Sequence, residues 1–199
     1  MANYWRSRTD LVAPKFSGID FGGVTNFYTC WMSCSSLSEF PKIDTSSGTT
    51  FASCWQECSS LTEFPKIDLS SGTSFESCWR SCSSLTEFPS ALDLSSGTNF
   101  SSCWRSCTSL EEFPGTLDLS SGTNFGYSWY QCTSLEEFPA LDLSSGTNFT
   151  NAWRGCTDAL FTTFPAVTFS TDADDDINFS QAWRSCTALT SFPALNLSR

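Results

Sequence analysis

The feature that most constrains this chain is a repeat of about 24 residues that runs through almost all of its length. Each unit carries a Phe, a Trp four residues later and a Cys three residues after the Trp. A Phe-Pro pair, an acid between two apolar residues and a Ser-Ser-Gly-Thr stretch complete the unit. The Trp positions are Trp31, Trp55, Trp79, Trp104, Trp129, Trp153 and Trp183. Self-similarity of this kind predicts a stack of equivalent units around a shared core.

The repeat also predicts how the chain is divided. We expect one repeat domain over residues 1–199, with an N-terminal half-repeat at 1–13, tandem repeats at 14–191 and a strand half-repeat at 192–199. The step from the acid position to Trp is 11 residues except in the last unit, where it is 15, and the step from Trp to Phe-Pro is 9 except after Trp153, where it is 11. Length changes confined to a few places indicate loops on a fixed scaffold.

Hydrophobic periodicity predicts one helix and one strand in each unit. Phe51, Cys54, Trp55 and Cys58 are spaced as one face of a helix. The triplet 67–69, Ile-Asp-Leu, alternates as a short strand does. The predicted fold is therefore an α/β solenoid, a leucine-rich-repeat-like stack of about seven to eight coils, each with one short parallel strand and one short helix. Helices pack further apart than strands, so we expect a bent rod with the strands on its inner side.

The eleven cysteines follow the same period. Where a unit has two cysteines, as at Cys30 and Cys34, they are four residues apart, which differs from the spacing of CxxC zinc or redox motifs. Both cysteine positions of a unit should point inward as small hydrophobic groups. We expect buried free thiols, with disulfides and metal binding as the alternatives.

Charge and composition narrow the function. The formal net charge is −11 and there is no histidine. An acidic surface disfavours nucleic acid and anionic membranes as partners, and without histidine the commonest general base is missing. We therefore expect that the chain is not an enzyme. We also expect no membrane insertion, because no apolar stretch is long enough to span a bilayer. The first residues also lack the apolar run of a signal peptide.

Acidic residues recur in two rows. One row, which we expect on the exposed face of the strands, is Asp44, Asp68, Asp93, Asp118 and Asp142; the other precedes each Phe-Pro pair and is Glu39, Glu63, Glu87, Glu112 and Glu137. The aspartates are our candidate binding surface, for a divalent cation or a cationic partner. The alternative is a solvated face whose Asp side chains bind nearby backbone amides.

Two further groups of charged residues could bind ions or form ion pairs. Asp172, Asp174, Asp175 and Asp176 lie in the insertion of the last unit and could hold a weak calcium site, or form a plain exposed loop, since the Gly and distal Glu of an EF-hand loop are missing. Apart from this calcium we expect no cofactor. The arginines that follow Trp should face solvent, where they could pair with Glu111, Glu136 or their neighbours; they are Arg80, Arg105, Arg154 and Arg184.

Residues 152–157 (Ala-Trp-Arg-Gly-Cys-Thr), and Cys107 with Leu110 before a Phe-Pro pair, resemble the BspA-like family of bacterial surface leucine-rich-repeat proteins, whose units carry an Ala-Phe-x-x-Cys-x-x-Leu core. The resemblance covers about residues 5–199. Trp occupies the family's Phe position, as in similar arrays encoded by marine phages. The resemblance implies surface exposure, adhesion and protein interaction without an enzymatic site, and no binding residue carries over from it.

The two ends of the chain are complementary in phase. Trp5 aligns with the repeated Trp, with Arg8 in place of the core Cys, and the sequence closes with the Phe-Pro and strand half of a unit. Joining two copies would continue the unit, short by about three residues. One interpretation is that these are capping half-units; the other is head-to-tail stacking into a fibre.

We therefore expect a non-enzymatic structural protein, extracellular, on a cell surface or on a virion, that forms such a homopolymer. The alternative is an adhesion module that recognises a host protein or glycan through its acidic strand face.

Overall fold

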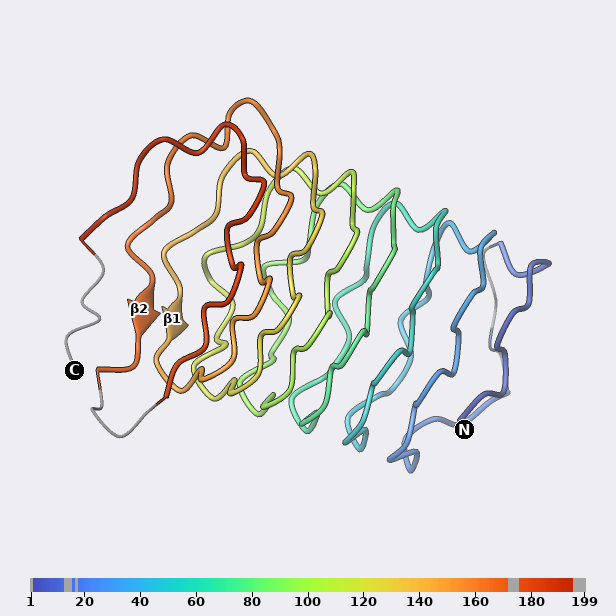
Figure 1. Cartoon of the computed structure of the whole chain (residues 1–199). Coiled ribbons are helices and arrows are strands. Elements are labelled where there is room, and N and C mark those ends of the chain that lie inside the picture. Colours follow the sequence, from blue (N-terminus) through green and yellow to red (C-terminus); the bar gives the residue numbers. More distant parts are fainter. Residues whose placement is uncertain (1, 13–15, 17, 172–175, 195–199) are drawn as a thin grey trace.

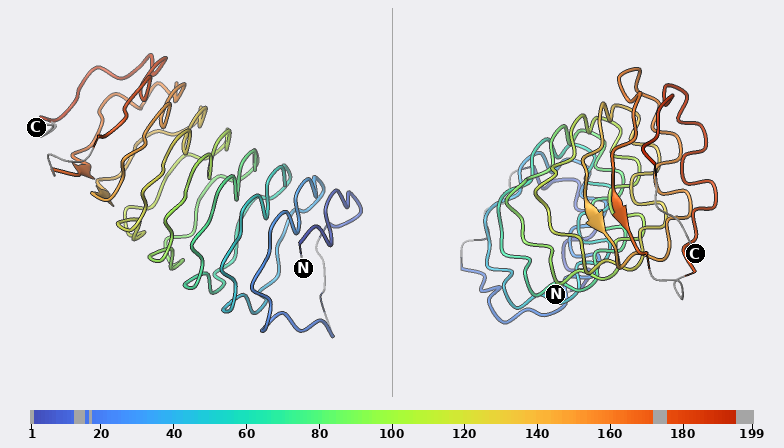
Figure 2. Two further views of the ribbon diagram at one scale, coloured as in Figure 1. Left: turned by 60° about the horizontal axis from the view of Figure 1, so that its bottom comes forward. Right: turned by 90° about the vertical axis from the view of Figure 1, so that its left-hand side faces the viewer.

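In the computed structural model, which describes residues 2–12, 16, 18–171 and 176–194, successive coils of the chain lie one upon the next from the N-terminal to the C-terminal end (Figure 1). Two further views show the same order of coils along the stack (Figure 2). The described residues contain two strands, β1 (Asp142–Leu143) and β2 (Thr168–Phe169), and no helix. The strands pair in parallel, with Asp142 opposite Thr168 and Leu143 opposite Phe169.

The prediction of a helix in each unit is wrong. In the unit of Phe51, two consecutive four-residue turns replace it: the N–H of Cys54 donates to the carbonyl of Phe51, and the N–H of Cys58 to that of Trp55. The third residue of each turn has a left-handed backbone, with φ of 54° at Ser53 and 62° at Glu57. Positive φ at this position is the mark of a type II turn. We call the eight residues from Phe to the second Cys position the turn segment (27–34, 51–58, 75–82, 100–107, 125–132, 149–156 and 179–186).

Coil spacing explains why turns replace helices. The centroids of successive Trp rings from Trp31 to Trp183 are 5.4 to 6.1 Å apart, whereas packed helices need about 8–10 Å. A helix also keeps its N–H groups for itself, but here every second N–H donates to the next coil. In one coil these bonds run from the N–H groups of Phe51, Ser53, Trp55 and Glu57 to the carbonyls of Ser74, Glu76, Cys78 and Arg80, at 2.7 to 2.9 Å.

The inward-facing columns are confirmed. The Trp rings from Trp31 to Trp153 are fully buried, and each stacks almost parallel on the next. The Phe that begins each turn segment forms a second stacked column, with centroids 5.2 to 5.6 Å apart. The Phe of the Phe-Pro pair lies nearly perpendicular to two Trp rings; Phe40, for example, makes 76° with Trp31 and 82° with Trp55. No oxygen or nitrogen of the described residues accepts a hydrogen bond from the buried indole N–H groups.

The Gly of the Ser-Ser-Gly-Thr stretch makes room for the Phe column. A Cβ built on Gly97 would lie 2.3 Å from Cζ of Phe100, and one on Gly122 would lie 2.3 Å from Cζ of Phe125. Any side chain here would displace a buried ring. Steric exclusion therefore explains the repeated Gly.

The predicted strands are confirmed only in part. Ile67 and Leu69 are buried and Asp68 between them is exposed, but among the described units a regular strand forms at this position only in β1 and β2. The Phe-Pro side, which runs from the end of each turn segment through Phe-Pro to the acid position, carries few bonds between coils, and Pro65 and its equivalents have no N–H to donate. Without helices, the reason for expecting a bent rod disappears.

Candidate functional site

The turn segments leave one edge of the stack with open donors. Along the stack, their N–H groups donate to carbonyls of the following coil, as from Trp153 to Ala182 at 2.9 Å. In the last described coil the equivalent donors are the N–H groups of Phe179, Gln181, Trp183 and Ser185. None of them meets an acceptor among the described residues.

The opposite edge presents open acceptors. Asn3, Trp5 and Ser7 donate to the carbonyls of the next coil at 2.7 to 3.1 Å. The carbonyls that alternate with these donors, at Ala2, Tyr4 and Arg6, accept no N–H from the described residues. The two edges therefore carry complementary halves of one hydrogen-bond ladder, in the same register.

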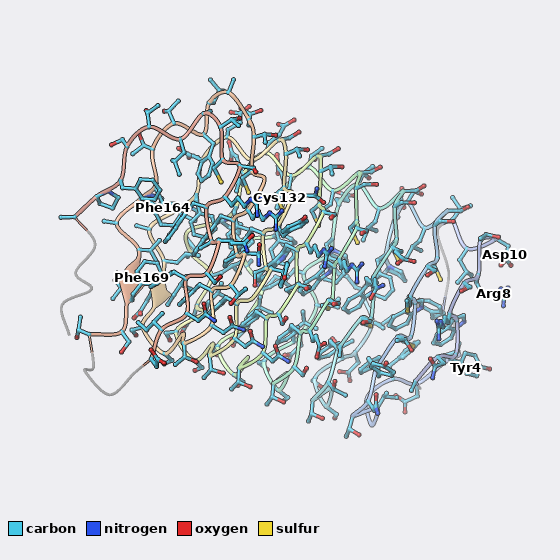
Figure 3. The ribbon with its side chains drawn as sticks, viewed as in Figure 1. Tyr4, Arg8, Asp10, Cys132, Phe164 and Phe169 are labelled. Carbon is cyan, nitrogen blue, oxygen red and sulfur yellow. The ribbon has the colours of Figure 1, made fainter. Side chains whose placement is uncertain are left out.

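Side chains at the two edges differ. At the first edge Tyr4 is 71% exposed and makes an edge contact with Trp5, which stacks on Trp31 at 5.3 Å. Figure 3 shows Tyr4 at this end, with Arg8 and Asp10 close by. Arg8, in the place of a core Cys, forms an ion pair with Asp10 that lowers the pKa of that carboxyl to about 2. At the other edge Trp183 is half-buried and Phe192 is 47% exposed.

The predicted acidic row lies on the surface, and each Asp is engaged locally. Asp44, Asp68, Asp93, Asp118 and Asp142 are all exposed. Each accepts the backbone N–H of the Ser two residues later, at 3.0 to 3.1 Å. Bonds from Ser46 and Ser95 lower the pKa of Asp44 and Asp93. The interpretation that these side chains bind local backbone amides is confirmed, and the cation or partner remains a prediction.

The predicted calcium loop falls mostly outside the described residues. Asp172, Asp174 and Asp175 are not among them, while Asp176 is described and exposed. Within the described chain, no group of three or more Cys, Asp or Glu side chains could hold a metal ion.

The cysteines are core groups, as predicted. All eleven are free, and all but Cys186 are buried. The second Cys of each turn segment donates its thiol to the Trp carbonyl of the preceding coil, as Cys132 does to Trp104 at 3.2 Å. Burial raises the pKa of these thiols, to about 12 at Cys107. Such groups are neutral donors near pH 7 and do not supply a thiolate nucleophile.

The arginines differ from the prediction. They lie on the outer surface of the turn segments, but none forms an ion pair with a described carboxylate; the pair in the described chain is Arg8 with Asp10. Arg105 lies over the ring of Tyr130 at 4.8 Å, and Arg154 lies on the same ring at 5.7 Å. The sequence alone did not suggest this role for Tyr130. A signal was present, because Tyr130 follows Trp129 directly, and no other unit has Tyr in the position after Trp.

Comparisons with known proteins add little. No family model and no curated protein matches the sequence. One solved structure, a leucine-rich repeat protein from Bacteroides ovatus, is similar over 85% of this chain and 70% of its own, with 15% identity and a TM-score of 0.24. The described part of the chain has no helix long and apolar enough to cross a membrane. At so low a TM-score, the two chains share at most a coarse leucine-rich-repeat character.

Proposed function

We propose that this chain is a non-enzymatic structural protein, acting outside the cell or on a virion, whose coils continue from one copy into the next. The observation that carries the proposal is the pair of complementary open edges. Donors at Gln181, Trp183 and Ser185 match acceptors at Ala2, Tyr4 and Arg6 in the register found between neighbouring coils. A head-to-tail contact of this type does not close on itself, so it generates a filament.

The aromatic columns support the same contact. Trp183 stacks on Trp153 with one face, at 5.5 Å, and its remaining exposure lies at the open edge. Phe192 continues the Phe-Pro column beyond Phe164, at 5.8 Å. A second copy would bury both rings, and burial of apolar surface contributes about 25 cal/mol per Å². Tyr4 covers part of Trp5 and has to rotate aside, which an exposed side chain does readily.

Light scattering and negative-stain microscopy of the 199-residue chain at rising concentration test the proposal. We expect rods that lengthen with concentration. Phe192→Glu places a charge in the joint and should raise the concentration needed for assembly at least tenfold. Tyr28→Glu changes an aromatic side chain of similar exposure (48%) on the second coil, one coil inside the first edge, and is the matched control. A chain that stays monomeric at high concentration, or a Phe192→Glu variant that assembles like the control, contradicts the proposal.

A second candidate function is binding of a cationic partner to the aspartate row, which the exposure of all five residues favours. Calcium is the simplest probe, since it prefers carboxylate oxygens. An increase of the melting temperature with calcium, lost in Asp93→Asn combined with Asp118→Asn, would support this role. An unchanged melting temperature would remove the cation version.

A further inference from the structure

The outer surface of the C-terminal turn segments is basic on an acidic chain. We call residues 99–109, 124–134, 148–158 and 178–188 the C-terminal turn face. It contains three basic residues, Arg105, Arg154 and Arg184, and one acid, Asp158, which accepts the backbone N–H of Leu160. The whole chain, by contrast, has 21 acids and 10 basic residues. The N-terminal turn segments differ, because Glu57 there lies close enough to Arg80 for their charges to interact.

Neutral groups hold these arginines in place. Nη1 of Arg154 donates to Oδ1 of Asn151 and to Oε1 of Gln181, both at 3.1 Å. Nη1 of Arg184 donates to the same oxygen of Gln181 at 3.0 Å. Arg105 lies over two Tyr rings, 5.5 Å from Tyr127 and 4.8 Å from Tyr130. The row is therefore ordered without a carboxylate partner among the described residues.

The shared oxygen brings two positive charges together. Since both Nη1 atoms bond Oε1 of Gln181, they lie within about 6 Å of each other. Two guanidinium groups at that distance repel, and an oxyanion between them would relieve the repulsion. Nε and Nη2 of Arg154 and Arg184 have no acceptor among the described residues, and a guanidinium fork matches a carboxylate in geometry.

We propose that Arg154, Arg184 and Gln181 form a binding site for the carboxylate groups of a linear acidic glycan, with Arg105 continuing the row. Arg154 and Arg184 lie on successive coils and Arg105 lies two coils before Arg154, with Tyr130 between them, so a linear chain can contact the arginines in turn. Ser180 precedes Gln181 and Ser185 follows Arg184 in the sequence, and hydroxyls of this kind both donate to and accept from sugar hydroxyls. The density of charge on nucleic acid suits a −11 chain poorly, while a glycan with one carboxylate per sugar is less repelled. The site is independent of whether copies join end to end.

Calorimetric titration with polygalacturonate at low ionic strength tests the site. The same polymer with its carboxylates methyl-esterified is the neutral control, and free galacturonate separates a polymer site from a site for any small anion. We expect at least tenfold tighter binding of the acidic polymer than of either control. Arg154→Gln with Arg184→Gln should weaken binding at least tenfold, and Arg80→Gln should change it less than twofold.

The variant Gln181→Glu is a second test that stays informative if the double arginine variant does not fold. It places a carboxylate between the two arginines and should abolish binding while leaving the melting temperature the same or higher, since Glu57, the third residue of the second turn in its own segment, already adopts a left-handed backbone. The glycan proposal is overturned if the acidic polymer does not bind, if the esterified polymer binds equally well, or if free galacturonate binds as tightly as the polymer. Unchanged affinity in the folded variants would likewise overturn it.

Discussion

The turn segments and the Phe-Pro side of the same coils follow different rules. Every turn segment has the same length, from Phe to the second Cys position, and each one before the last donates four N–H groups to the next coil. The Phe-Pro side varies in length and bonds between coils only at scattered positions, such as Thr62 to Ser38. The comparison shows that backbone pairing and stacked aromatics together fix the length of a segment, whereas buried side chains alone tolerate insertions.

An insertion tests this difference most severely. One Gly inserted between Ser102 and Cys103 would shift Trp104 out of its column and break the ladder to both neighbouring coils, so we expect loss of cooperative thermal unfolding. Two residues inserted after Pro114, on the Phe-Pro side, should lower the melting temperature only slightly, as the natural extension after Trp153 suggests. Calorimetry measures both. Equal damage at the two sites would refute the distinction.

Alkaline pH should attack the turn segments selectively, because all eleven cysteines lie in them. Burial raises the thiol pKa from about 9 to about 12 at Cys30 and Cys107. Below pH 9 the thiols are neutral in both states. Between those values only the unfolded chain releases its protons, so the free energy of unfolding falls as pH rises, by about 1.4 kcal/mol per unit for each thiol.

Urea unfolding from pH 7 to 11, with a thiol count in the native and unfolded states, checks this expectation. Cys186, which is half-buried, should react first. A flat stability profile up to pH 11 would mean that the thiols are not held neutral. Acid should have a weaker effect, since the aspartates of the Phe-Pro side are exposed.

Substitution of one Trp compares an interior coil with a terminal one. Trp104 stacks between Trp79 and Trp129 and is fully buried. Trp104→Ala should cost about 3–5 kcal/mol of the free energy of unfolding, as truncation of a buried aromatic side chain does. Trp183→Ala removes a ring stacked on one side and should cost less than half as much. Chemical denaturation measures both values, and equal costs would argue against a continuous column.

Substitutions at residues with a left-handed backbone should change the free energy of unfolding the least. Ser106 has φ of 59°, a conformation that Gly adopts without steric cost. Ser106→Gly should therefore raise the free energy of unfolding by up to about 1 kcal/mol. At the same position two coils later the chain has Gly155, with φ of 77°, and Gly155→Ala should lower it by a similar amount. Effects of the same sign would contradict this account.

Much of the core could be predicted from the sequence, because equivalent positions in a repeat share one environment. The burial of Phe51, Trp55 and Cys58 followed from the spacing alone. Their backbone did not, since two consecutive turns place residues i, i+3, i+4 and i+7 on one side as a helix does. The overlooked constraint was the distance between successive Trp rings, because stacked indoles hold the coils too close together for helices.

The surface was harder to predict. That Asp68 binds Ser70 follows from local sequence, since Asp readily bonds the backbone two residues on. The neutral partners of Arg154 did not follow, because Gln181 is 27 residues away and reaches it only through the coil register. Charge counting favoured pairing with Glu136, which lies on the Phe-Pro side of its coil.

The parallel indoles have an optical consequence. Rings stacked in one line at 5.3 to 6.1 Å do not emit independently. Excitation absorbed by one Trp passes to its neighbours before emission, so the intrinsic fluorescence belongs to the column as a whole. Local unfolding of a single coil interrupts the row of Trp rings and leaves two shorter rows. The fluorescence of the native chain therefore reports whether the Trp column is continuous.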